Sequence, residues 1–125
     1  LINKNFSNSK ILIIGVAYKK NVNDTRESPS IKIIENLHSR GAKLMYHDDY
    51  VKKINLKINK KDYSLRKKDY SLKSSKLDKK NLNAVDLVCI ITDHDYINYE
   101  NIKKYSKIIV DCRGRYKSAK NIIKA

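Results

Sequence analysis

KILIIG at residues 10–15, a polar loop at residues 16–27 and the dipeptide Ser28-Pro29 decide the fold of this chain. The first segment is a short β-branched run that ends in glycine, which is typical of a buried parallel strand. The dipeptide predicts the start of a helix, because Ser28 can cap free backbone N–H groups and Pro29 fixes φ in the first turn. Together they indicate a strand, a loop and a helix.

The same alternation of strands and helices continues along the chain. The first helix is expected to end at Gly41, which can adopt the left-handed conformation of a helix terminus. We therefore expect one α/β domain over residues 1–125, a Rossmann-like three-layer domain with a mostly parallel sheet. The other expected elements are strands over Lys43 to His47, Asp86 to Thr92 and Lys107 to Asp111, helices over Asp78 to Asn83 and Tyr99 to Tyr105, and a helical or frayed basic tail from Arg115 to Ala125.

Composition narrows the class of protein. Hydrophobic residues make up 41% of the chain in short runs, and none approaches the roughly 20 apolar residues of a membrane span. Residues 1–9 lack the pattern of a secretory signal, so we expect a cytoplasmic protein without membrane contact, and we expect further sequence before Leu1. Two cysteines, Cys89 and Cys112, have no metal-binding spacing and indicate a reducing compartment; Cys89 is expected to be a small buried residue.

Most of the positive charge lies in one stretch. The chain has a net charge of +15, and residues 51–80 hold twelve lysines and arginines against three aspartates. This stretch lacks a clean period and contains a near-duplication, KKDYSL at residues 60–65 and 67–72. We interpret residues of about 52–75 as a basic surface loop or insertion, with a short strand near Tyr70 to Leu72.

The strand ends predict where a ligand would bind. In an open parallel sheet, ligands bind outside the carboxyl ends of the strands, near the point where strand order reverses. The loops at that edge carry Lys19, Arg26 and Arg113, and the helix that begins at Ser28 adds its positive end. Convergent cations favour a phosphate-bearing ligand. The alternative for Arg26 is an ion pair with Asp24 or Glu27. The other residues expected at this edge are Tyr18, Lys20, Asp24, Asp48, Thr92, Asp93, His94, Asp111 and Cys112.

Other candidate sites are weaker. The turn after the first strand is not the GxGxxG fingerprint of dinucleotide-binding domains, and no P-loop motif occurs. His94 is expected to be a bystander while Asp93 or Asp95 caps a helix. His47 and the two carboxylates that follow it do not make a metal site without further ligands. We therefore expect no metal site and no catalytic residue in this chain.

The segments ILIIGVAYKK (residues 11–20) and NDTRESP (residues 23–29) closely resemble the signature of the C-terminal, UDP-binding domain of the UDP-glucose/GDP-mannose dehydrogenase family. The resemblance extends through Gly41 and residues 47–48, then through residues 86–94, and ends at residues 111–113. The sequence at residues 46–48 and 92–94 is most similar to the branch of the family that acts on UDP-N-acetylhexosamines. Asp49 and Gly114 depart from the family pattern, which usually has proline and asparagine there.

The resemblance implies an enzyme that oxidises the C6 alcohol of a UDP-sugar to a carboxylate and reduces two NAD⁺, with a place in polysaccharide biosynthesis. By carry-over, Tyr18, Lys19 and Arg113 contact the UDP-sugar, and Arg26 reaches NAD. NAD would be bound mainly by a domain absent from this chain, and the covalent cysteine of the family also lies outside it, so this chain alone would be inactive. Its partners would be the remainder of the dehydrogenase chain and, in the full enzyme, further copies in a homo-oligomer.

Two other functions stay open at this point. Residues 51–80 could form a basic nucleic-acid-binding module in which Tyr63 and Tyr70 stack on bases. The charge distribution weakens this hypothesis, so we regard nucleic acid as the less favoured partner. A domain used only for interaction or dimerisation is the third hypothesis.

Overall fold

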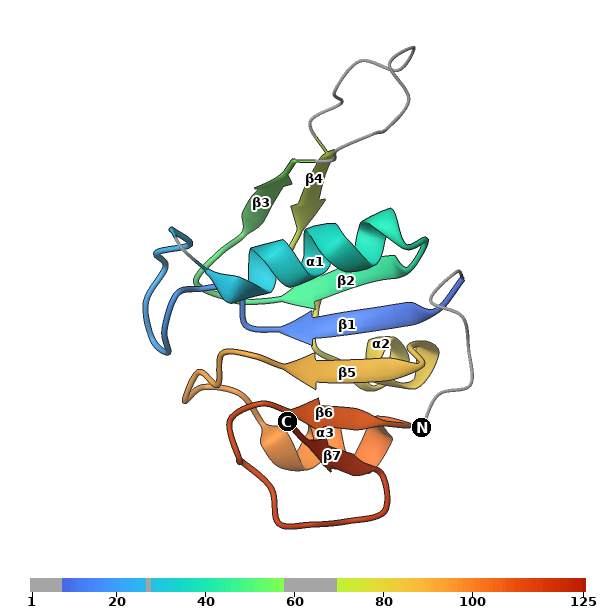
Figure 1. Cartoon of the computed structure of the whole chain (residues 1–125). Helices are drawn as coiled ribbons and strands as arrows, with labels where there is room; N and C mark the ends of the chain where they lie inside the picture. The colour runs from blue at the N-terminus through green and yellow to red at the C-terminus, as the bar shows by residue number, and fades with distance from the viewer. Residues whose placement is uncertain (1–7, 27, 58–69) are drawn as a thin grey trace.

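A five-stranded parallel sheet organises the molecule (Figure 1). The computed structural model describes residues 8–26, 28–57 and 70–125. Every neighbouring pair of strands in this sheet is parallel, as the buried apolar runs predicted. In spatial order the strands are β2 (Lys43–His47), β1 (Lys10–Ile14), β5 (Leu87–Ile90), β6 (Ile109–Asp111) and β7 (Ile122–Lys124).

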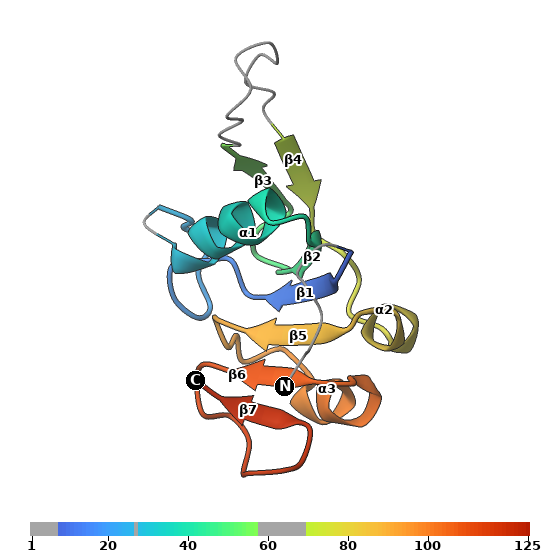
Figure 2. The same ribbon diagram turned by 45° about the vertical axis from the view of Figure 1, so that its right-hand side comes forward.

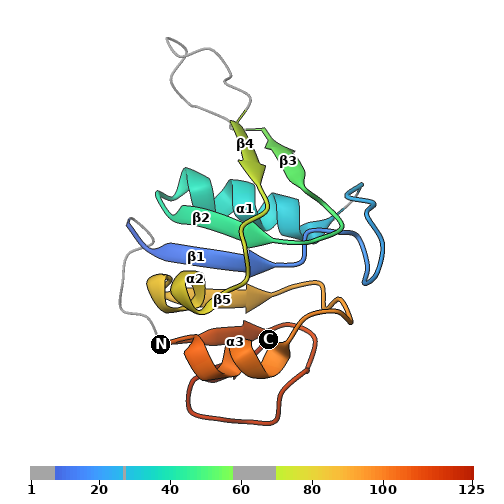
Figure 3. The same ribbon diagram turned by 180° about the vertical axis from the view of Figure 1, so that it is seen from behind.

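Helices lie on both faces of the sheet. Helix α1 (Pro29–Ser39) packs on one face over β1 and β2, whereas α2 (Lys79–Ala84) and α3 (Tyr99–Tyr105) lie on the other, as the front and back views show (Figures 1 and 3). This confirms the three-layer α/β architecture. None of the described helices is long and apolar enough to cross a membrane.

Side chains of β1 alternate between two hydrophobic cores. Ile11 and Ile13 pack with Ile34 of α1, while Leu12 and Ile14 pack on the opposite face with residues of α2 and α3. All four β1 side chains are at most 2% exposed. A strand that is buried on both faces is the reason for the unbroken apolar run at residues 11–14.

A small antiparallel hairpin extends the molecule beyond β2. Strands β3 (Lys53–Leu56) and β4 (Tyr70–Lys73) pair with each other, and Figure 2 shows them beside α1, at the end of the molecule opposite β7. The strand predicted near Tyr70 is confirmed, but the loop prediction was wrong for β3, whose Ile54 and Leu56 are buried in the α1-side core. The near-duplication and Tyr63 fall largely or wholly in residues 58–69, outside the described residues.

Two local predictions also need correction. The C-terminal tail was expected to be helical or frayed, but residues 122–124 form β7, because Ile122 and Ile123 pair with β6. Ser28 is the N-cap of α1, yet its hydroxyl makes no capping bond and instead donates to the carbonyl of Val16 at 2.7 Å. Pro29 begins the helix, and Gly41 follows its end with φ of +90°, as predicted.

Candidate functional site

The candidate site lies at the carboxyl edge of the sheet. From β1 the chain passes to β2 on one side, and the later strands β5, β6 and β7 continue on the other side, so strand order reverses between β1 and β5. The loops after β1, β5 and β6 therefore meet at the edge where an α/β sheet binds its ligand. Figure 1 shows these loops together at one side of the sheet.

The ends of β1 and β5 approach each other closely. Gly15 has φ of +85°, and a Cβ at this position would lie 2.6 Å from the Cβ of Thr92. The Thr92 hydroxyl donates to the carbonyl of Ala17 at 2.8 Å, and Ser30 of α1 donates to the carbonyl of Gly15 at 2.7 Å. Only glycine fits this left-handed, crowded position, so the turn after β1 is tied to both β5 and α1.

Asp48 holds the β1 loop from the neighbouring strand. Its carboxylate is fully buried and accepts hydrogen bonds from the backbone N–H groups of Val16 (2.9 Å), Ala17 (3.1 Å) and Tyr50 (2.9 Å). The same carboxylate lies 2.8 Å from Nε2 of His94. A buried carboxylate with this many donors is well compensated. Asp48 was predicted at the ligand-binding edge, and it lies there as the buried anchor of that edge.

His94 joins the β1 and β5 loops through hydrogen bonds, and the predicted helix cap by Asp93 or Asp95 was wrong. The imidazole is fully buried, and its Nδ1 accepts a hydrogen bond from the N–H of Asn21 at 2.7 Å. Because a backbone N–H can only donate, this bond assigns the proton to Nε2, which donates to Asp48. Neither Asp93 nor Asp95 caps α3, since Asn98 occupies the N-cap position and accepts from the N–H of Asn101.

Further bonds across the β1 and β5 loops were not predicted. Asn21 has φ of +64°, its side-chain amide donates to Asp95 at 2.7 Å, and Lys20 lies 3.8 Å from the same carboxylate. Arg115 pairs with Asp93 at 3.2 Å and stacks its guanidinium over the ring of Tyr99. Asp95 thus contacts the β1 loop, and Asp93 contacts Arg115 in the segment after β6. An asparagine in a loop after a buried strand was the one local signal for the turn at residue 21.

Tyr18 and Lys19 lie on the loop that Asp48 fixes. The N–H of Tyr18 donates to the carbonyl of Asp24 at 2.6 Å, and the Tyr18 side chain is exposed with a fraction of 50%. Lys19 is exposed as well, and within the described part of the chain its ammonium group has no partner. The backbone of this loop is therefore anchored while both side chains face solvent.

Arg113 follows β6 and reaches back towards β5. Its N–H donates to Asp111 at 3.0 Å, and its Nε donates to the carbonyl of Ile91 at 2.7 Å. The terminal nitrogens of the guanidinium have no partner among residues 8–26, 28–57 and 70–125. An oriented guanidinium with a free fork is suited to two phosphate oxygens.

Arg26 lies in the same β1 loop but is engaged by a neighbour. Its guanidinium contacts Asp24 through two nitrogens, and the closest pair lies at 2.9 Å, which confirms the ion-pair alternative with Asp24. The hydrogen bonds from Arg26 hold the pKa of Asp24 below its usual value. Because the Arg26 side chain is 89% exposed, a negatively charged ligand could still reach it. Glu27 lies outside the described residues.

The other histidine and cysteine residues considered as candidates are His47, Cys89 and Cys112. His47 donates from Nδ1 to the carbonyl of Ser75 at 2.8 Å, and its Nε2 accepts from the hydroxyl of Tyr96 at 2.9 Å. No cluster of three or more metal ligands occurs among the described residues. Cys89 is partly buried, and desolvation raises the pKa of its thiol to about 12, whereas Cys112 is exposed.

The basic stretch does not form an aromatic platform where the structure describes it. Tyr70 is 39% exposed, but its ring packs 4.8 Å from the ring of His38 on α1. The stacking role suggested for Tyr63 cannot be placed, because that residue lies outside the described ranges.

The fold and the edge described above define a Rossmann-like α/β domain with cationic loops at its strand-order reversal. A family profile described as the UDP binding domain of the UDP-glucose/GDP-mannose dehydrogenase family matches residues 12–118. The chain belongs to this family, which confirms the resemblance of its motifs.

Individual relatives agree with the family. The chain is 30% identical over 113 residues to a UDP-N-acetyl-D-mannosamine dehydrogenase of Methanocaldococcus jannaschii, covering 84% of this chain and 22% of that protein. It is also 47% identical over 47 residues to a UDP-glucose 6-dehydrogenase of Caenorhabditis elegans, covering 38% of this chain and 10% of that protein. The chain thus spans about a fifth or less of the length of these relatives. They are dehydrogenases, and they do not support the nucleic-acid hypothesis.

A solved structure shares the fold over nearly the whole chain. The UDP-D-ManNAc dehydrogenase from Pyrococcus horikoshii superposes with a TM-score of 0.68 and 25% identity, covering 98% of this chain and 26% of that one. A UDP-glucose dehydrogenase from Pyrobaculum islandicum has a TM-score of 0.60 at 24% identity, and this similarity concerns the fold alone.

Proposed function

We propose that this chain is the nucleotide-sugar-binding C-terminal domain of a cytoplasmic, NAD-dependent UDP-sugar 6-dehydrogenase, a homo-oligomer in polysaccharide biosynthesis. The observation that carries the proposal is the pair of fixed cationic loops at the carboxyl edge, one with Lys19 and one with Arg113. The Arg113 fork and the Lys19 ammonium group would bind the two linked phosphates of a UDP-sugar, and the exposed ring of Tyr18 would lie against the same ligand.

The reaction is an oxidation of the sugar C6 alcohol to a carboxylate. C6 would lose two hydrides to two NAD⁺ bound mainly outside this chain, water would supply the second carboxylate oxygen, and three protons would be released. The task of this chain is to bind and orient the substrate, so that interactions at the diphosphate hold C6 where residues outside this chain act on it. The raised pKa of Cys89 makes this thiol unsuited to covalent catalysis, because such catalysis needs a thiolate.

The residues at this edge fit NAD at one contact only. The turn after β1 holds Gly15 against Thr92, which leaves no glycine-lined cradle of the dinucleotide type beside that strand. Arg26 is exposed and can contact a phosphate of NAD that another part of the enzyme binds. NAD supplies the hydride acceptor when bound, and Arg26 would contribute one charge to holding it.

Titration of the 125-residue chain with UDP tests the substrate site. We expect NMR shift changes at Tyr18, Lys19 and Arg113, and we expect Arg113→Ala to weaken UDP binding by at least about tenfold, because a charge-assisted fork is lost. Lys79→Ala is the control, since it removes one positive charge from α2, away from this edge. Equal weakening by both variants, or no shift at these residues with millimolar UDP, would contradict the proposed site.

A further inference from the structure

A second basic region lies outside the proposed UDP-sugar site, where β2 meets the β3–β4 hairpin. A pocket of about 590 Å³ opens there. Its walls come from the segment between β2 and β3, the last residue of β4 and the segment that follows β4. The lining residues are Asp48, Asp49, Lys52, Lys73, Ser74, Ser75 and Lys76.

Three lysines of this pocket are unpaired within the described part of the chain. The ammonium groups of Lys52, Lys73 and Lys76 make no ion pair or hydrogen bond within the described residues. The one exposed carboxylate of the lining belongs to Asp49, since the Asp48 carboxylate is buried and occupied by its own donors. Three like charges around one pocket repel one another, and an anion would relieve that repulsion.

The backbone beneath these lysines is fixed. The N–H of Ser74 donates to the carbonyl of Lys52 at 2.9 Å, and the N–H of Ser75 donates to the carbonyl of Tyr46 at 2.7 Å. These bonds tie the segment after β4 to the residue that precedes β3 and to β2. The backbone that carries the two serines is therefore fixed, and Lys73 and Lys76 flank these serines in the sequence.

Two hydroxyl groups add neutral donors. Ser74 Oγ accepts from the N–H of Asp48 at 2.9 Å, so its own hydroxyl proton remains available. Ser75 uses its backbone N–H and carbonyl in hydrogen bonds, and its hydroxyl has no partner in the described part of the chain. The pocket thus offers donors of both kinds to an anion, ammonium groups and hydroxyls.

From this arrangement we propose that the pocket binds a compact phosphate-bearing anion of the diphosphate class. Three lysines act as point charges, which suits phosphate oxygens, whereas selective binding of a planar carboxylate favours the fork of an arginine, and none lines the pocket. This site does not depend on the proposed UDP-sugar function, because it shares no side chain with Tyr18, Lys19, Arg26 or Arg113.

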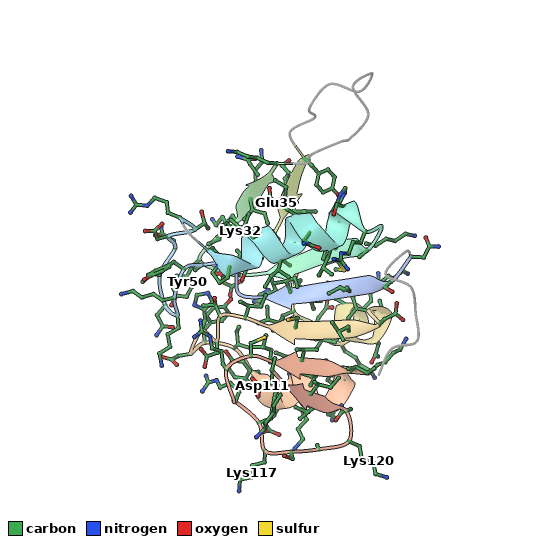
Figure 4. All side chains as sticks on the ribbon, viewed as in Figure 1. Lys32, Glu35, Tyr50, Asp111, Lys117 and Lys120 are labelled. Carbon is green, nitrogen blue, oxygen red and sulfur yellow. The ribbon has the colours of Figure 1, made fainter. Side chains whose placement is uncertain are left out.

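The test is an NMR titration of the 15N-labelled chain with sodium pyrophosphate at constant ionic strength. We expect saturable shifts at the amides of Ser74, Ser75 and Lys76. The double variant Lys73→Gln/Lys76→Gln should weaken that binding by at least about tenfold. The matched control is Lys117→Gln/Lys120→Gln, which removes the same charge from the loop between β6 and β7, at the opposite end of the molecule (Figure 4), and should change the affinity less than about twofold.

Other variants separate this pocket from the UDP-sugar site. Asp49→Asn removes the opposing carboxylate and should tighten pyrophosphate binding, and Arg113→Ala should leave the signals of residues 74–76 unchanged. Shifts confined to Tyr18, Lys19 and Arg113 would overturn the second site and leave the first one intact. Equal weakening by the pocket and control variants, or equal affinity for citrate, would also overturn the proposal, since attraction by net charge would then explain the binding.

Discussion

Two buried aspartates hold the two loops of the proposed UDP-sugar site, and they do so over different distances along the chain. Asp48 reaches from the end of β2 to the N–H groups of Val16 and Ala17 in the loop after β1. Asp111 ends β6 and accepts from Arg113 and Tyr116 within its own turn. The first loop therefore depends on the assembly of neighbouring strands, whereas the second is stabilised locally.

This difference predicts that the β1 loop is the more costly one to break. Asp48→Ala removes the acceptor of three backbone N–H groups and of His94, all in a buried setting. We expect a loss of about 3–5 kcal/mol in the free energy of unfolding, the range seen when one partner of a buried charged network is removed. Urea denaturation followed by circular dichroism measures it.

The neighbouring aspartate provides the control for that variant. The Asp49 side chain is 68% exposed, and Asp49→Ala should change the unfolding free energy by less than about 0.5 kcal/mol. A loss for Asp48→Ala as small as this would mean that the β1 loop is held by its other contacts.

The glycines of the two loops also differ in the expected cost of substitution. Gly15 and Gly114 both have positive φ, +85° and +70°, but a Cβ at Gly15 collides with Thr92, while a Cβ at Gly114 meets nothing within 4 Å. Gly114→Ala should cost about 1–2 kcal/mol from backbone conformation alone. Gly15→Ala should cost about 3 kcal/mol, because the crowding at β5 is added to that conformational cost. Equal unfolding free energies for the two variants would show that β5 moves aside without cost.

The sequence predicted the elements that local pattern determines and missed those that need a distant partner. The run at residues 11–14 and Ser28-Pro29 predicted β1 and α1, and the order of elements placed the strand-end loops at one edge of the sheet. β7 was missed, because two isoleucines in a basic tail become a strand only by pairing with β6. β3 was missed because its alternating Ile54 and Leu56 stand among lysines, and the core that buries them is formed by other segments.

The candidate site divides in the same way. Residues on strand-end loops, such as Lys19 and Arg113, could be selected from the order of elements. The buried bond between Asp48 and His94 could not, because it joins residues 46 positions apart and depends on the register of β1 between β2 and β5.

A pH-dependent prediction concerns the local anchor, Asp111. Burial opposes ionisation of its carboxyl group, but the N–H groups of Tyr116, Arg115, Arg113 and Gly114 outweigh that effect and hold its pKa below the usual value. A lowered pKa in the folded state stabilises the protein above the unfolded pKa of about 3.9, and this stabilisation is lost as the pH falls through the folded value.

We therefore expect Asp111→Asn to lower the unfolding free energy by about 1–2 kcal/mol at pH 7, since a neutral amide oxygen is a weaker acceptor for these N–H groups. The difference from the parent chain should shrink as the pH is lowered below about 4. Urea denaturation at several pH values measures it, with Asp49→Asn as the exposed control. A difference that stays constant down to pH 2 would show that packing around the turn, and not the charge of Asp111, holds the Arg113 loop in place.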